Sequence, residues 1–280
     1  MRIYFDAKDI IEIIENSNPI SSKELEKRFI EKNNELVISN TLLLEISEPL
    51  ILKSQKTNVM NVINQIDVIP HIFIKTKNLI HLELLEAINA FNKMEYKNID
   101  PFTSRYTETI DFDTRFPLGK YIIYSLAEIV WIFYHEGALG GFDKHAVRWR
   151  NVFSMERSLA TRQPKKDNFV TSIKKHLSMS KLRLPSQDIK SFSEWIYKKP
   201  SRCPSTRLIN EVFHMIVKNT DDIPKNSDLE DFVHIECLPY VDLMTVDRRF
   251  YAYIYQVSKS INFDYKSKIR KSAKEILDYI

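Results

Sequence analysis

The chain has 280 residues, of which 44% are hydrophobic and 28% are charged, and its formal net charge is +4. This composition is that of a globular protein and excludes wholesale disorder, and the length allows one elaborated domain or two small ones. With only 4 glycines and no Gly-Lys-Ser/Thr motif, a glycine-rich phosphate loop is excluded. The two distant cysteines, Cys203 and Cys237, exclude a disulfide scaffold and a cysteine zinc knuckle, and they suit a reducing cytosol.

The first part of the chain alternates between short apolar runs and amphipathic segments. Its pattern predicts strands at residues 2–5 and 36–38, helices at 9–16, 21–32 and from Ser39 onwards, and a further strand at 68–74 that Pro70 interrupts. Strands and helices that alternate at this spacing favour an α/β unit with a parallel sheet.

The middle of the chain is mostly helical in its apolar periodicity, from residue 79 to about 219. Residues 121–134 are nearly all apolar, which predicts a buried helix, and loops are expected at 99–117 and 137–141. Strand character returns at 241–246, after a helix at 229–237. We therefore expect an α/β fold whose core is formed by residues 1–75 and 225–280, with residues 76–224 as a helical insertion.

Targeting signals are not expected. Asp6 stands where a signal peptide needs its apolar stretch, and the run at 121–135 is interrupted by Glu128 and falls short of the about 20 residues that span a bilayer. The sequence thus predicts a cytoplasmic protein with no membrane partner.

Positive charge is concentrated in one stretch. Residues 144–207 hold 16 Lys and Arg but only four acids, a net charge of +12 that leaves −8 for the rest of the chain. Such a block is typical of a surface that contacts phosphates, although lysines often only solvate helices. The candidate nucleic-acid-binding residues are Arg148, Arg150, Lys165, Lys166, Lys198, Lys199 and Arg202. Aromatic residues within the block could stack on bases, but core packing is the favoured interpretation.

Three acids lie at or near the ends of the predicted strands. Asp6 ends the first strand, Glu45 lies about one turn inside the helix after the second, and Asp247 ends the late strand. Because ligands of a parallel sheet bind at the carboxyl ends of its strands, we expect these carboxylates to converge there. They would repel one another unless Mg²⁺ or Mn²⁺ neutralised them.

Three further acids are candidate metal ligands. Asp228 and Asp231 share one face at the start of a helix, where they could instead favour the helix dipole, and Asp242 begins the late strand, where it could simply face solvent. His234 follows Asp231 by three residues and could join the site, but packing is the favoured interpretation.

Three segments together resemble the PIN domain: Arg-Ile-Tyr-Phe-Asp at 2–6, Ile-Ser-Asn-Thr-Leu-Leu-Leu-Glu at 38–45, and Leu-Pro-Tyr-Val-Asp-Leu-Met-Thr-Val-Asp at 238–247. Members of that family carry an Asp at a strand end, a Glu early in a following helix, a helical Asp, and a strand that ends in Thr-x-Asp. The resemblance covers roughly residues 1–75 and 225–260, so the middle of the chain has no counterpart in it.

The resemblance implies a PIN-like parallel sheet flanked by helices and a metal-dependent ribonuclease. Asp6, Glu45, Asp231 and Asp247 would be its catalytic acids and would hold Mg²⁺ or Mn²⁺, with Thr245 as the hydroxyl before the last acid. Asp228 competes with Asp231 for the helical position, and Asp231 is preferred because apolar residues follow it. The implied partners are RNA and, if the chain is a toxin or defence effector, an inhibitory protein. A homo-oligomer is a separate expectation. The alternatives are a catalytically inactive PIN-like module that binds nucleic acid or protein, and a DNA nuclease.

Overall fold

The computed structural model describes residues 1–52, 55–75, 79–93, 98–105, 123–135, 137, 139, 151, 153–158, 165–223, 225 and 227–280. Their strands form one sheet in the order β4-β3-β2-β1-β5-β6. The strand bounds are β1 Arg2–Tyr4, β2 Glu35–Ile38, β3 His71–Ile74, β4 Phe102–Thr103, β5 Leu243–Thr245 and β6 Ile269–Arg270. All neighbouring pairs are parallel except β3 and β4. The predicted α/β class with a mostly parallel sheet is confirmed.

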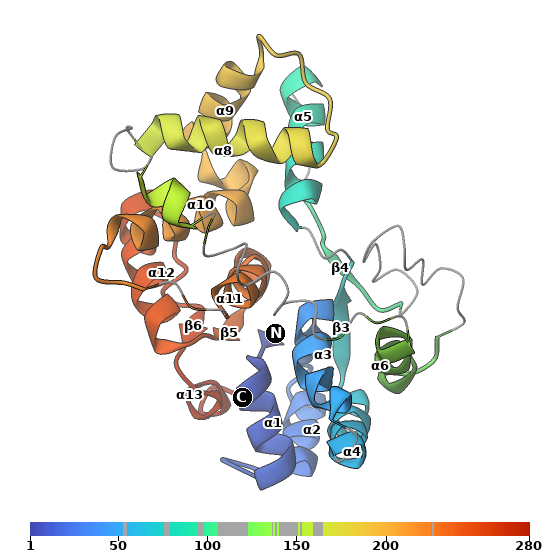
Figure 1. Cartoon of the computed structure of the whole chain (residues 1–280). Helices are drawn as coiled ribbons and strands as arrows, with labels where there is room; N and C mark the ends of the chain where they lie inside the picture. The colour runs from blue at the N-terminus through green and yellow to red at the C-terminus, as the bar shows by residue number, and fades with distance from the viewer. Residues whose placement is uncertain are drawn as a thin grey trace.

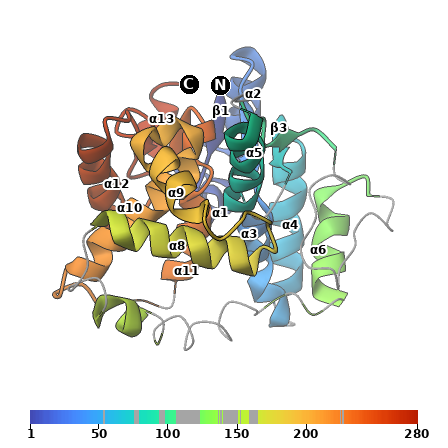
Figure 2. The ribbon, with the colours of Figure 1, turned by 90° about the horizontal axis from the view of Figure 1, so that it is seen from above.

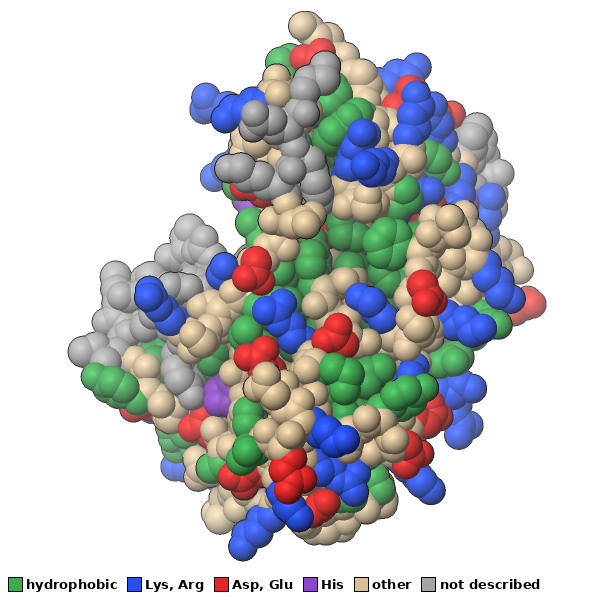
Figure 3. Space-filling view, turned by 180° about the vertical axis from the view of Figure 1, so that it is seen from behind, with side chains coloured by type: hydrophobic (Ala, Val, Ile, Leu, Met, Phe, Trp, Pro, Cys, Tyr) green, Lys and Arg blue, Asp and Glu red, His purple; other side chains and the backbone are tan. Residues whose placement is uncertain are grey.

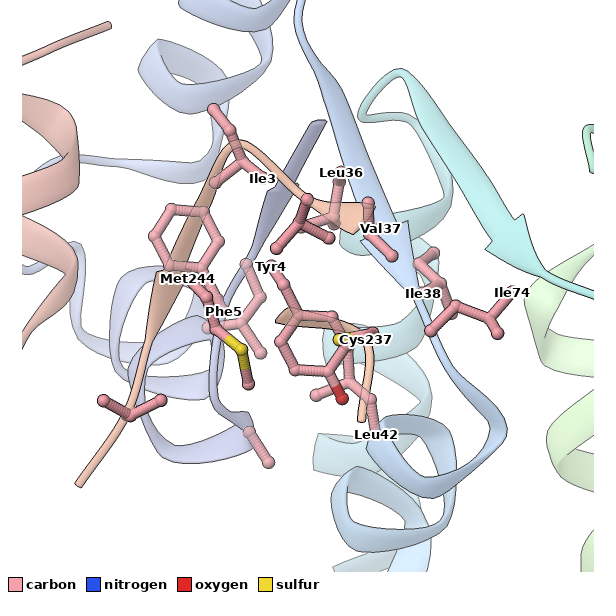
Figure 4. Packing of buried hydrophobic residues seen from close by; sticks show 14 of the residues in the cluster. Ile3, Tyr4, Phe5, Leu36, Val37, Ile38, Leu42, Ile74, Cys237 and Met244 are labelled. Carbon is pink, nitrogen blue, oxygen red and sulfur yellow. The ribbon is translucent and has the colours of Figure 1, made fainter. Parts of the chain in front are cut away.

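The central strands are apolar after their first residues, Arg2 in β1 and Glu35 in β2, because they pack on both faces of the sheet. Ile3 and Tyr4 of β1 are fully buried, as is Leu36 of β2. Figure 4 shows these side chains together with Met244 of β5 and Leu42, all within one core cluster. Burial on both faces explains why the strands appear in the sequence as continuous rather than alternating apolar runs.

Helices surround the sheet, and their starts agree with the predicted caps. The helix bounds are α1 Ala7–Asn16, α2 Ser22–Glu31, α3 Asn40–Ser47, α4 Lys56–Asp67, α5 Leu79–Lys93, α6 Leu126–His135, α8 Lys165–Met179, α9 Ile189–Lys198, α10 Pro204–Lys218, α11 Asp228–Ile235, α12 Arg248–Ile261 and α13 Ala273–Leu277. Ser21 caps α2 and Ser39 caps α3 through their hydroxyls. Within the described residues, no helix has both the length and the apolarity that a membrane span needs.

The chain reverses direction across the sheet at β1. It runs outward from β1 to β2 and β3, and returns much later to place β5 on the other side of β1. A crevice at the carboxyl ends of the strands forms at such a reversal, and it is the usual ligand site of open α/β sheets. The two termini lie side by side in both ribbon views (Figures 1 and 2).

Residues 76–224 do not form one unit apart from the sheet. Helices α5, α8 and α9 build a second apolar core and lie together at one end of the molecule (Figure 1). In contrast, α6 and much of α10 pack into the core of the sheet, and β4 extends the sheet itself. The expected boundaries at residues 75 and 225 therefore do not coincide with the division between the two cores.

Three local predictions differ from the structure. β4 and β6 were not expected, because two-residue strands are too short to show a period. The helix expected at 121–134 is α6, and it is buried on one face only, with Tyr134 exposed and Trp131 half-buried. The polar residues of α6 lie close to its ends, so the sequence does not show which face of the helix is exposed. Aromatic rings such as that of Trp131 tolerate partial exposure, which was the only signal. The strand expected at 68–74 begins only after Pro70, which lacks the N–H that a ladder needs.

A buried carboxylate joins the second core to the first. Glu83 of α5 is fully buried, and its two oxygens accept hydrogen bonds from the backbone N–H groups of Ser205 and Thr206 at 2.7 and 2.8 Å. The hydroxyls of Thr206 and Tyr240 each donate a further bond at 2.8 Å. Since the first N–H groups of α10 have no partner within their own helix, Glu83 caps α10 from a distance.

We predict that Glu83→Ala lowers the free energy of unfolding by about 3–5 kcal/mol, because it leaves several buried donors without an acceptor. Chemical denaturation of the full chain measures this change. Glu86→Ala, a change in the same helix at a half-buried position, is the control and should cost much less. Equal losses in the two variants would contradict the capping role of Glu83.

Candidate active site

Two acids from opposite ends of the sequence meet at the carboxyl edge of the sheet. β1 and β5 are neighbours, with Tyr4 aligned to Met244, so Asp6 and Asp247 leave the same edge two or three residues later. The backbone N–H of Asp6 donates to Oγ1 of Thr245 at 2.7 Å, which ties the two strand ends together. The expected convergence of Asp6 and Asp247 is therefore present.

A small hollow lies between these strand ends and α11. Its volume is about 10 Å³, close to what one water molecule needs. The polar side chains that line it are Tyr4, Asp6, Asp231, His234, Thr245 and Asp247. Three of the four acids implied by the resemblance, from β1, α11 and β5, thus share one hollow.

Two of these acids also act as helix caps. Asp6 accepts a hydrogen bond from the N–H of Lys8 at 2.9 Å and caps α1, and Asp247 accepts one from Phe250 at 2.6 Å and caps α12. In both cases the bond is made by Oδ1 alone. The capping role and a role in the hollow are therefore compatible for each residue.

Glu45 does not line the hollow but lies beside it. Its Oε2 is 2.9 Å from Nε2 of His234, and Nδ1 of His234 contacts the hydroxyl of Tyr4. That hydroxyl is also 2.8 Å from Oγ of Ser39, the cap of α3. A continuous polar network thus joins β1, α3 and α11 and fixes Glu45 in place.

Charge repulsion and burial act together on the acids. Burial raises the pKa of Asp6, and the carboxylates of Glu45 and Asp247 raise it further, against the opposing effect of His234. Burial, followed by the charge of Asp247, raises the pKa of Asp231 to about 7. These shifts are those expected where buried carboxylates are crowded together.

The pKa of the His234 imidazole is also raised. Burial would lower the pKa of His234, but Glu45, and then Asp6 and Asp231, raise it. The surrounding carboxylates therefore favour the protonated form of the His234 imidazole. The sequence placed His234 one turn after Asp231, but gave no sign that Glu45 and Tyr4, from distant segments, would contact it.

Two of the six acids are not brought to the hollow. Asp228 is fully buried in an ion pair with Arg249, and its Oδ2 also accepts from the N–H of Lys225 at 2.9 Å. Asp242 lies at the start of β5, at the opposite edge of the sheet, where its Oδ2 accepts from the N–H of Arg2 at 2.7 Å. Of the two helical acids, the geometry therefore favours Asp231 for the hollow.

Asp9 is an acid next to the site that the sequence did not single out. The hydroxyl of Thr245 interacts with the carboxylate of Asp9, which also accepts from the N–H of Ala273 at 3.3 Å. The hydroxyl of Thr245 thus accepts a hydrogen bond from the backbone N–H of Asp6 and also interacts with the carboxylate of Asp9. The spacing of three residues between Asp6 and Asp9 was a visible signal for one shared helix face.

The donors at the hollow suit a hard divalent cation, since Asp6, Asp231 and Asp247 offer carboxylate oxygens. As they stand, however, no three His, Cys, Asp or Glu side chains among the described residues form a group that could hold a metal ion. Glu45 is turned to His234, and each capping Asp has one oxygen engaged. Binding of a metal would therefore require the carboxylates to draw closer together.

Some cations of the basic block form ion pairs within the fold. Lys165 pairs with Glu211, Lys166 with Glu194 at 3.0 Å, and Lys175 with Glu156 at 3.7 Å. Figure 3 shows Lys and Arg side chains in several separate groups on one face, with acidic side chains between them. A single continuous phosphate-binding patch is not visible on that face.

The remaining candidate cations differ in their surroundings. Lys198 and Lys199 are exposed at the end of α9, whereas Arg202 donates to the carbonyl of Trp195 and lies 3.7 Å above its ring. Arg148 and Arg150 lie outside the described residues. Among the aromatic residues of the block, Phe153, Phe169 and Phe192 are buried, as the core interpretation predicts.

Comparison with models of protein families, with curated proteins and with solved structures gives no significant match.

We predict that Asp231→Asn changes how stability depends on pH. The pKa of Asp231 is about 7 in the folded chain and near 3.8 when exposed, so the folded chain keeps a proton that the unfolded chain releases. This contribution to stability is complete below about pH 4 and is lost as the pH rises through about 7. Between about pH 5 and pH 8 the wild type should therefore lose about 1–3 kcal/mol more unfolding free energy than Asp231→Asn.

Chemical denaturation at the two pH values, with a chelator present, measures this difference. Asp242→Asn serves as the control, because Asp242 lies at the other edge of the sheet, and its pH dependence should match that of the wild type. If the unfolding free energies of wild type and Asp231→Asn changed with pH in parallel, folding would not raise the pKa of Asp231, and the prediction would be wrong.

Proposed function

We propose that the chain is a PIN-like, metal-dependent ribonuclease that hydrolyses RNA phosphodiester bonds. The observation that carries this proposal is the shared hollow of Asp6, Asp231 and Asp247 at the reversal point of the sheet. The same acids occur in the order along the chain that the PIN domain has. Crowded carboxylates with raised pKa values for Asp6 and Asp231 support a site that gains from a divalent cation.

Asp6, Asp231 and Asp247 would hold Mg²⁺ or Mn²⁺, and Glu45 would complete the set once it separates from His234. When bound, such an ion activates a water molecule and neutralises the charge that develops on the phosphate. The free oxygens of Asp6 and Asp247 are suited to this task because their other oxygens are already held by helix N–H groups.

The surrounding residues would position the substrate and the acids. Helices α1 and α12 both begin at the hollow, capped by Asp6 and Asp247, so the positive ends of their dipoles face an approaching phosphate. Thr245 and the network of Tyr4 and His234 would keep the acids in register. Exposed Lys198 and Lys199 would attract the RNA backbone at a distance from the hollow.

We predict that the full chain cleaves labelled single-stranded RNA with Mn²⁺, and that Asp6→Asn lowers the rate about a hundredfold or more. Asp242→Asn is the matched control, because it makes the same change in an acid at the opposite edge of the sheet. A parallel digest of single-stranded DNA separates a ribonuclease from a DNA nuclease. Equal rates for wild type and Asp6→Asn, or no cleavage of any substrate with Mg²⁺ or Mn²⁺, would contradict the proposal.

We also predict that RNA binding weakens steeply with salt, because phosphate contacts release counterions. The double change Lys198→Ala and Lys199→Ala should reduce the slope of log affinity against log salt by about one. Lys23→Ala and Lys32→Ala, two exposed lysines on α2 and at its end, are the control pair. Filter binding with Ca²⁺ in place of Mn²⁺ measures the slope, and a flat response in the wild type would remove the role of the basic block.

A catalytically inactive PIN-like module is the second candidate, favoured by one observation. Glu45 is held by His234, and the described residues contain no preformed metal-holding group. In such a module His234 would replace the cation permanently. RNA binding without cleavage, unchanged in Asp6→Asn, would support this candidate.

A further inference from the structure

A second and larger cavity lies on the side of α11 that faces away from the acid hollow. Its volume is about 420 Å³, within the range of about 300–1,000 Å³ that small-molecule sites occupy. Helix α11 and its C-terminal cap line it with Leu229, Phe232, Val233 and Glu236. These positions follow the spacing of a single helix face, whereas Asp231 and His234 lie on the face toward the hollow.

The rest of the cavity wall comes from the second core and from α10. Phe169 of α8, Tyr197 of α9 and Phe213 of α10 contribute aromatic surface. Helix α8 crosses beside α9 and α10 in both ribbon views, so the cavity lies where the two cores of the molecule meet (Figures 1 and 2). Sites for small ligands commonly lie at such junctions.

The charged groups of the wall are paired with one another. Lys165 forms an ion pair with Glu211, and Lys175 lies 3.7 Å from Glu156. Arg207, which is buried behind the wall, adds a second partner to Glu211 at 2.8 Å. A charged ligand would have to separate one of these pairs, whereas an uncharged ligand leaves them intact.

The remaining titratable wall groups are held in their neutral forms. Burial lowers the pKa of His176 and of His214, and burial raises the pKa of Glu236 to about 8, with the carboxylate of Glu83 adding to the effect. Most of the surface of the wall is apolar. His176, His214 and Glu236 add no unpaired charge to it at neutral pH.

One polar group of the wall lacks a partner. Nδ2 of Asn168 on α8 is buried and makes no hydrogen bond. A buried amide donor without an acceptor is costly, and rotation of the Asn168 amide toward a ligand that offers an acceptor would remove that cost.

We propose that this cavity binds an uncharged, largely apolar small molecule that accepts a hydrogen bond from Asn168, and that the ligand shifts α11 and thereby Asp231 and His234. Helix α11 lines the cavity with one face and the acid hollow with the other. A ligand that displaces this short helix at the cavity therefore also displaces Asp231 and His234 at the hollow. The regulatory meaning of the shift rests on the proposed function, but the binding does not.

Binding is tested with Nile red, an uncharged, environment-sensitive dye that carries a carbonyl acceptor. We expect saturable fluorescence enhancement with one dye per chain. Ser172→Trp, at a half-buried wall position of α8, should weaken binding about tenfold or more by filling the cavity. Ser178→Trp makes the same change at an exposed position of α8 outside the wall, and it should leave the affinity unchanged.

Two further arms test the ligand class. Asn168→Leu should weaken Nile red binding about two- to tenfold, the effect of one hydrogen bond. Anilinonaphthalene sulfonate, an anionic dye, should bind more weakly than Nile red. No binding of Nile red, binding that Ser172→Trp leaves intact, or equal preference for the anionic dye would overturn the proposed site.

Coupling through α11 is read from the imidazole resonances of His234, assigned by comparison with His234→Gln. Saturation with Nile red should shift these resonances, and their constancy at full occupancy would overturn the coupling. Nile red binding should persist in Asp6→Asn. Dye binding without RNA cleavage therefore contradicts only the proposed function, and cleavage without dye binding contradicts only this inference.

Discussion

Carboxylates from separate segments share one edge of the sheet, and their mutual repulsion is the constraint around which the site is organised. The pairing of β1 with β5 places Asp6 and Asp247 together, and α11 adds Asp231. Three features offset the repulsion: the N–H groups of two helix starts, the imidazole of His234, whose pKa is raised, and the raised pKa of Asp231, which favours its protonated form. A divalent cation could replace the last two.

The fold supports this arrangement from both sides. The first core fixes the strands, and Glu83 anchors α10 and η6 (Leu238–Tyr240), the segment immediately before β5, to the second core. The ion pair of Arg249 with Asp228 holds the start of α11 against α12. Asp228, a candidate for the hollow, thus serves instead the packing of the elements that form it.

Much of the site could be predicted from the sequence, because the ends of strands can be recognised where apolar runs stop. Asp6 and Asp247 close apolar runs, and a parallel sheet brings such ends together. Side-chain partnership was not visible. His234 contacts Glu45 and Tyr4 from distant segments, and Glu211, outside the basic stretch, pairs with Lys165 and Arg207 within it. Counting charge along the chain could not reveal the pair of Lys165 with Glu211, because it forms only when α8 meets α10. Asp242 was a candidate because the sequence alone did not show which end of the late strand would meet the other acids. The structure places Asp242 at the opposite edge of the sheet.

The pairing of β1 with β5 has a consequence for biosynthesis. Strand β1 leaves the ribosome long before its neighbour β5 is made, because the two are far apart along the chain. Contacts between such distant segments form late, after the intervening helices have been made. A growing polypeptide therefore cannot assemble the acid hollow until β5 and Asp247 have been made, long after β1 has left the ribosome.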